Sequence, residues 1–254
     1  MSAPLVLPKL SVSQFAERFR GEMIPLSTTF SYFCASVPMS EEDLKEYLQE
    51  PVASLPPSIA AALPKISLLL VPYLERARQE KKKAEPAGAE YVSIERPPDG
   101  RLSPYTQVKL GDETVLAFAL KDQEVAEYHY RFYHILATLL ADQWSEDAAT
   151  KYTRLLREEA AADAHGEVDE PSWRLKQSLR RSSTVRKSKG FSDYVRQSFA
   201  DTLTLYLHGI CCDIDVDTGP RQLPSRYLRK RLQLMEDLFP PPAGYAVFPD
   251  QLEP

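Results

Sequence analysis

Two of the four histidines of this chain lie in the stretch YHYRFYHILATLLADQW, residues 128–144, whose apolar residues recur at helical spacing. Histidine is a common metal ligand, but a helical zinc pair needs two histidines four residues apart on one face. His129 and His134 are five residues apart, which is about 140° from alignment on a helix. The spacing therefore argues against chelation by this pair and predicts that His134 is a core or boundary residue, hydrogen-bonded within a helical bundle.

A second group of reactive residues stands near the end of a later helix. Cys211 and Cys212 are adjacent, and vicinal cysteines either bind soft metals or are small buried hydrophobic residues. Both interpretations remain open. His208 precedes Gly209, which resembles a helix C-cap, where the helix dipole would favour a protonated imidazole. The pattern predicts a structural role for His208.

The run DIDVDTG, residues 213–219, has aspartates at the first, third and fifth positions of a calcium-binding loop. Such a loop also needs glycine at position six and a bidentate glutamate at position twelve. Thr218 and Pro224 occupy those positions. We therefore expect poor calcium affinity and a solvated segment.

The most informative surface segment is LRRSSTVRKSKG, residues 179–190, in which basic side chains surround three consecutive hydroxyls. The basic residues are Arg180, Arg181, Arg186, Lys187 and Lys189. Ser183 follows two arginines, as in the sites of basophilic kinases, and its phosphorylation would place about −2 charge among cations. The segment is either a solvated linker or a surface that binds an acidic partner or a phosphate.

Composition narrows the class of protein. The chain has 254 residues, a net charge of −5, 43% hydrophobic residues and 26% charged residues, as expected of a soluble globular protein. The negative charge argues against a nucleic-acid binder, because phosphate binding relies on excess Lys and Arg. No glycine-rich phosphate-binding motif occurs. The sequence indicates no cofactor.

Location is predicted from the apolar stretches and the cysteines. The most apolar stretch, residues 59–74, is interrupted by Pro64, Lys65 and Pro72, so we expect a buried, kinked helix and no membrane span. The N-terminus shows no secretory signal. Three cysteines make no disulfide framework, which is typical of a reducing, cytoplasmic compartment.

The elements that must position these residues follow from periodicity. Ser11 with Gln14 and Ser40 with the acids after it predict two helix starts. A longer helix is expected over 58–84. Residues 90–121 change to strand spacing and contain an LGDE hairpin turn. Further helices are predicted over 123–143, 146–163, 171–182, 191–208 and 225–238.

These elements predict a mostly helical α+β domain covering residues 1–254, with a small antiparallel sheet of about three strands. A helical part, 1–86, precedes the sheet at 90–121, and a second helical part, 123–238, follows it. The proline-rich tail, 239–254, is expected to bury Tyr245, Val247 and Phe248 on the surface.

The order of elements over about residues 105–238 resembles that of lethal-factor-like zincin metallopeptidases. In that family an antiparallel edge precedes an HExxH helix, and a later helix supplies a glutamate ligand. The stretch FADTLTLYL, residues 199–207, is the closest piece to the family's later helix. The resemblance implies a zincin frame for this part of the chain.

The catalytic motif of that family is absent. His134 would occupy the first histidine position, Ile135 replaces the general-base glutamate and Thr138 replaces the second histidine. Gln197 stands where the glutamate ligand should be. Zinc hydrolysis needs three protein ligands and a base, so a related chain with these residues is expected to be inactive.

These observations lead to two hypotheses about function. The first is a non-catalytic cytoplasmic protein-interaction module, whose unknown and possibly acidic protein partner binds the basic segment. The second is a metal-dependent hydrolase of zincin type or its inactive descendant. No nucleic-acid or membrane partner is predicted.

Overall fold

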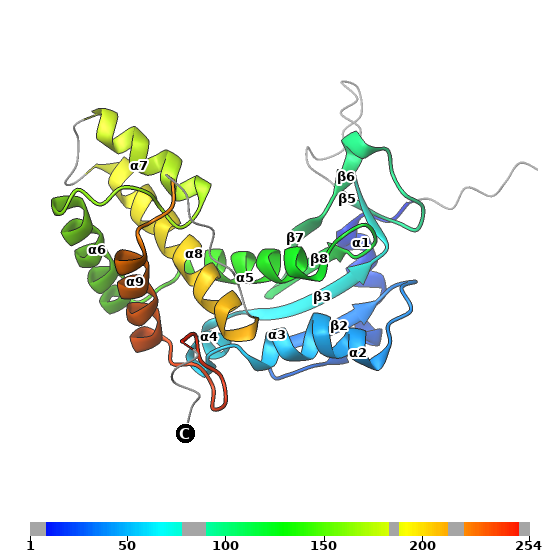
Figure 1. Cartoon of the computed structure of the whole chain (residues 1–254). Helices are drawn as coiled ribbons and strands as arrows, with labels where there is room; N and C mark the ends of the chain where they lie inside the picture. Colours follow the sequence, from blue (N-terminus) through cyan, green and yellow to red (C-terminus); the bar gives the residue numbers. More distant parts are fainter. Residues whose placement is uncertain (1–8, 78–89, 183–187, 213–220, 249–254) are drawn as a thin grey trace, which may run out of the picture. The chain divides into compact units, whose positions relative to one another are not determined.

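The structure is a computed structural model that describes residues 9–77, 90–182, 188–212 and 221–248 (Figure 1). The chain divides into two compact units, one formed by residues 1–49 and 64–128, the other by residues 50–63 and 129–254. We call them the sheet unit and the helical unit and describe each by itself. One of the points at which the chain passes between the units, 128/129, lies within helix α5 (Val125–Ala141).

The main sheet of the sheet unit has five strands in the order β1-β2-β3-β8-β7. Strands β2, β3 and β8 are parallel, whereas β1 and β7 pair antiparallel at the two edges. The central strand β3 is buried from Ile66 to Val71, on both faces. A nearly continuous apolar run is what a parallel strand covered on both sides requires. The strands are β1 (Ile24–Pro25), β2 (Phe30–Cys34), β3 (Lys65–Val71), β7 (Tyr105–Leu110) and β8 (Glu113–Ala119).

A second, antiparallel sheet of three strands has the order β5-β4-β6. Its strands are β4 (Tyr73–Arg76), β5 (Glu90–Ser93) and β6 (Leu102–Ser103). Helix α1 (Val12–Arg18) buries Val12 and Ala16 in a core shared with Leu69 of β3 and Val115 of β8. The short helix α2 (Glu41–Leu44) continues into a π-helical turn, Lys45–Gln49, and single 3₁₀ turns cover Arg20–Glu22 and Asp99–Arg101.

The α+β class, the two helix starts and the hairpin are confirmed. Ser11 with Gln14 forms a reciprocal capping box, and so does Ser40 with Asp43. The hairpin joins β7 to β8 across Gly111, whose φ of 63° suits a tight turn. The expected sheet of three antiparallel strands is wrong in detail, because the main sheet is mixed and larger.

The long helix expected over residues 58–84 is wrong. Helix α4 (Pro57–Ala62) is short, and the chain then forms β3 and β4 on either side of Pro72. The segment KISLLLV, in which five of the seven residues are apolar, shows no clear helix or strand period, so it fits a buried strand as well as a buried helix. The prolines at 64 and 72 lie between elements and are not kinks within one helix.

The helical unit is built around α8 (Lys189–Cys211), which packs against α6, α7 and α9 (Figure 1). Phe199, Leu203 and Tyr206 of α8 are fully buried. Its other helices are α3 (Glu50–Ala53), α4, α5 from His129 onward, α6 (Glu146–Ala161), α7 (Glu170–Ser182) and α9 (Ser225–Leu238). All five helices predicted beyond residue 122 are therefore present, within a few residues of the expected bounds.

The tail after α9 meets its prediction in part. Tyr245, Val247 and Phe248 are half-buried, and the guanidinium of Arg229 lies 5.2 Å from the centre of the Phe248 ring. Among the described residues, none of the helices combines the length and the apolar content needed to cross a bilayer.

The capping box at α1 gives the first testable prediction. Ser11 accepts a hydrogen bond from the Gln14 backbone N–H, 3.3 Å away. Ser11→Ala should therefore lower the free energy of unfolding by about 1 kcal/mol. Ser13→Ala, inside the same helix, is the matched control and should be neutral or slightly stabilising, because alanine has the higher helix propensity. Urea unfolding followed by circular dichroism measures both. Equal losses in the two variants would contradict the capping role.

Candidate functional site

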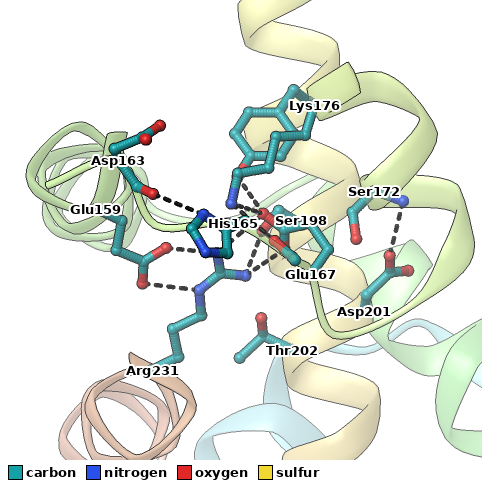
Figure 2. Close-up of polar contacts among 12 residues, drawn as sticks. Glu159, Asp163, His165, Glu167, Ser172, Lys176, Ser198, Asp201, Thr202 and Arg231 are labelled. Atoms are coloured by element: carbon teal, nitrogen blue, oxygen red, sulfur yellow. Dashed lines mark hydrogen bonds and ion pairs between the residues drawn. The ribbon is translucent and has the colours of Figure 1, made fainter. Parts of the chain in front are cut away.

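A cluster of buried ionisable groups in the helical unit surrounds Arg231 of α9, which is completely buried. Its guanidinium pairs with two carboxylates (Figure 2). Nη2 lies 2.6 Å from Oε2 of Glu159 on α6, and Nη1 lies 2.7 Å from Oε2 of Glu167 in the α6–α7 loop. Both carboxylates are also buried. A buried arginine of this kind is stable only when its donors are paired.

Further polar groups complete this network. Lys176 of α7 places Nζ 3.1 Å from Oε1 of Glu167 and donates to the carbonyl of Gly166 at 2.8 Å. Tyr194 of α8 donates a hydrogen bond to Glu167. Arg231 Nη1 also donates to the Ser198 hydroxyl at 2.8 Å. We call Arg231, Glu159, Glu167 and Lys176 the Arg231 network; it has two cations and two anions and is therefore neutral.

The electrostatics of the network favour the charged form of Glu167. Burial alone would raise the pKa of Glu167. The charge and hydrogen bonds of Arg231, together with Lys176 and Tyr194, outweigh burial and lower that pKa to about 2. Burial raises the pKa of Tyr152, whose hydroxyl lies 2.7 Å from that of Thr202, to about 12. Neither group is set to exchange protons near neutral pH.

Local backbone geometry fixes Glu167. Glu167 forms a bridge with Gln222, in which its N–H donates to the Arg221 carbonyl at 2.9 Å and its carbonyl accepts from Leu223 at 3.1 Å. Gly166 makes this close approach possible for two reasons. A Cβ atom at this position would lie only 2.0 Å from the Gln222 carbonyl oxygen. The φ angle of Gly166 is also 78°, which favours glycine. The backbone of the loop between α6 and α7 is thus held in a defined position at Gly166 and Glu167.

A second cluster joins His129 of α5 to the end of α8. His129 is buried, and its Nδ1 lies 3.3 Å from Sγ of Cys212. One ligand atom from each of His129, Cys211 and Cys212 lies within 4.8 Å of the other two. Among the residues that the structure describes, these three side chains are the set of His, Cys, Asp or Glu groups placed closely enough to hold a metal ion. The sequence pattern left both uses of the cysteine pair open and did not connect it to His129.

The helix C-cap predicted at Gly209, just after His208, is wrong. Helix α8 continues through Gly209 to Cys211, and Cys212 is its cap residue. Burial, with a smaller contribution from the charge of His129, lowers the pKa of His208 to about 4. His208 is therefore neutral near pH 7, which is the opposite of the protonated imidazole that the helix dipole was expected to favour.

The residues carried over from the zincin resemblance lie in ordinary helical surroundings. His134 is half-buried, and its Nδ1 lies 3.5 Å from the Thr204 hydroxyl. Thr138 donates back to the His134 carbonyl at 2.8 Å. Gln197 donates to Oδ1 of Asp201 at 2.8 Å. None of the three belongs to the group of potential metal ligands found among the described residues.

The basic segment is described in part. Arg180 pairs with Asp163 at 2.8 Å, whereas Arg181 at the end of α7 and Lys189 at the start of α8 are exposed. Ser183, Arg186 and Lys187 lie outside the described residues, as does the aspartate run 213–219.

The Arg231 network predicts a specific pH dependence of stability. The pKa of Glu167 is about 2 in the folded chain against an ordinary 4.5. Its contribution is therefore present above pH 4.5 and is lost as the pH falls toward 2. Arg231→Met should lower the free energy of unfolding at pH 7 by about 3–5 kcal/mol, because it leaves a buried carboxylate without its main partner. The difference from the unsubstituted chain should shrink as the pH falls.

Lys230→Met is the matched control, since Lys230 is the exposed neighbour on the same helix. Denaturant unfolding of both variants at several pH values between 2 and 7 makes the comparison. A loss in Arg231→Met that does not change with pH would show that the arginine acts through packing alone.

Comparison of the chain with protein-family models, curated proteins and solved structures found no match.

Proposed function

We propose that this chain is a non-catalytic, cytoplasmic protein-interaction module that binds an acidic protein partner through the basic segment 179–190. The observation that carries the proposal is the charge arrangement at the junction of α7 and α8. The segment contains five cations and no carboxylate, in a chain with a net charge of −5. Two of these cations, Arg181 and Lys189, are exposed and form no ion pair with a described residue.

The internal charges support the non-catalytic part of the proposal. Glu167 is the buried carboxylate whose pKa is most clearly lowered, and it is held by Arg231, Lys176 and Tyr194 together. A carboxylate with a pKa of about 2 is a weak base near neutral pH. Its partners already occupy its hydrogen-bonding positions, so the network is better suited to fixing the helices than to proton transfer.

The position of the basic segment also supports binding. It joins two helices whose packed faces are anchored: Lys176 of α7 and Tyr194 of α8 both contact Glu167. The helices on either side of the segment are therefore fixed, so a partner that contacts their described residues has less conformational freedom to restrict there. Ser183 lies within it, so phosphorylation would reduce its positive charge and weaken binding to an acidic partner.

A second candidate function is a metal-dependent hydrolase of zincin type or its inactive descendant. It is favoured by one feature of the fold, the β7–β8 hairpin that is followed in sequence by α5. The family's base and two of its ligands are replaced by Ile135, Thr138 and Gln197. Zinc-dependent cleavage of a peptide library by the purified chain, abolished by His134→Ala, would favour this candidate over the interaction module.

Neutralising the basic segment tests the leading proposal. We expect a variant with glutamine at Arg180, Arg181, Arg186, Lys187 and Lys189 to bind the acidic partner with a slower on-rate, because electrostatic attraction mainly accelerates encounter. Exposed charges contribute little to folding, so its melting temperature should change little. The partner is first captured by crosslinking in extracts of the source cells, and association is then measured by surface plasmon resonance at several salt concentrations.

The matched control neutralises Lys151 and Arg154 of α6, which are exposed and pair with carboxylates of the same helix. It should bind as the unsubstituted chain does. If the fivefold variant keeps its on-rate and salt dependence, the basic segment does not form the binding surface. If that variant unfolds, the segment is part of the folded structure and the proposal is also wrong.

A further inference from the structure

Three side chains with nitrogen and sulfur ligand atoms converge inside the helical unit, away from the basic segment. We propose that His129, Cys211 and Cys212 form a binding site for one thiophilic closed-shell cation, with Zn²⁺ as the expected occupant. His129 comes from α5, and the two cysteines come from the last turn and the cap of α8. The inference does not depend on the proposed function.

The distances between the ligand atoms fit a tetrahedral ion after small side-chain rotations. Zn–S bonds of about 2.3 Å and Zn–N bonds of about 2.0 Å place neighbouring ligand atoms roughly 3.4–3.8 Å apart in a tetrahedron. Cys212 Sγ and His129 Nδ1 are already 3.3 Å apart. All three ligand atoms lie within 4.8 Å of one another, so movements of about 1 Å would bring them to the separations of a tetrahedral site.

The end of α8 explains how two adjacent cysteines can reach one ion. Successive side chains on a continuous helix point about 100° apart. Cys211 is the last residue of α8, whereas Cys212 is extended, with φ −136° and ψ 145°. This change of backbone conformation turns the second thiol toward the first and toward His129.

A further imidazole lies beside the three ligand groups. The centre of the His208 ring is 6.2 Å from that of His129. His208 is a neighbour of the site and does not belong to the group of converging ligand atoms.

The ligand types select the class of cation. Two sulfurs and one imidazole suit Zn²⁺ and other thiophilic ions, whereas Mg²⁺ and Ca²⁺ prefer oxygen ligands. Three protein ligands leave one tetrahedral position for a water or an external ligand. His129 is 6% exposed and both cysteines are half-buried, so the ion would be shielded on the side of α5 and reachable from the side of the cysteines.

The test is a titration of the reduced, metal-free full chain with Co²⁺, which serves as a spectroscopic probe for zinc sites. We expect a thiolate-to-Co²⁺ charge-transfer band in the near ultraviolet and visible bands typical of a tetrahedral ion, all displaced by one equivalent of Zn²⁺. Excess Zn²⁺ should also raise the melting temperature, because it binds the folded chain. Cys211→Ser and Cys212→Ser should each weaken the charge-transfer band, and the double variant should lose it. His129→Ala should weaken Co²⁺ binding.

Two matched controls separate this site from others. Cys34→Ser removes the remaining cysteine, which belongs to the sheet unit, and His134→Ala removes the other histidine of α5. Both should keep the spectrum of the unsubstituted chain, because neither side chain belongs to the group of converging ligand atoms. Circular dichroism confirms that each variant is folded. The absence of a charge-transfer band in the unsubstituted chain, its persistence in the double cysteine variant, its loss in Cys34→Ser, or unchanged Co²⁺ affinity in folded His129→Ala would overturn the proposal.

Discussion

The burial of the Arg231 guanidinium is the constraint on which the helical unit depends. Removing a charged group from water costs several kcal/mol even after the surroundings relax, and only well-placed opposite charges offset that cost. Arg231 receives them from Glu159 on α6 and Glu167 in the α6–α7 loop, with the Ser198 hydroxyl of α8 as a further acceptor. Three segments must therefore be in place before α9 can bury its arginine. We infer that the network serves mainly to select one arrangement of these helices.

The network also explains the loop between α6 and α7. A loop of this length would ordinarily lie on the surface and tolerate change. Here Glu167 is 1% exposed, and the backbone around it bonds to residues 221–223, just before α9. Gly166 permits that close approach. The backbone just before α9 is thus fixed by hydrogen bonds and the middle of α9 by Arg231, so this helix is held in place at two points.

The sequence contained a signal for this network that periodicity arguments did not use. Tyr152, Leu156 and Glu159 follow one buried face of α6, and Tyr227, Arg231 and Met235 follow one buried face of α9. Each charged residue therefore stands where an apolar residue is expected, and two such residues of opposite sign can satisfy one another. The helical period of the apolar residues predicted α5–α9 well, because those helices are amphipathic. No such periodic signal existed for β3, which is apolar on both faces, or for Glu167, which lies in a loop.

The His129–Cys211–Cys212 cluster could not be predicted from the sequence for a different reason. The hydrogen-bonded pair His129 and Cys212 is separated by 83 positions, and only the packing of α5 beside the end of α8 brings them together. Helical spacing correctly argued against a pair formed by His129 and His134, because that is a question about one helix. Ligands contributed by two helices depend on tertiary packing, which a single sequence does not reveal.

The neutrality of the Arg231 network bears on how the basic segment would select a partner. Two cations and two anions cancel inside the helical unit, so the net charge of −5 is carried by the remaining residues. An acidic protein is therefore repelled by the chain as a whole and attracted by one segment. Salt screens both effects beyond about 8 Å at physiological ionic strength. The attraction then acts only when an acidic patch approaches residues 179–190 closely and in the right orientation. We infer that such a surface favours a partner with a compact acidic patch over a partner that carries the same charge spread evenly. The compact patch gains the local attraction and brings no further negative charge near the rest of the chain.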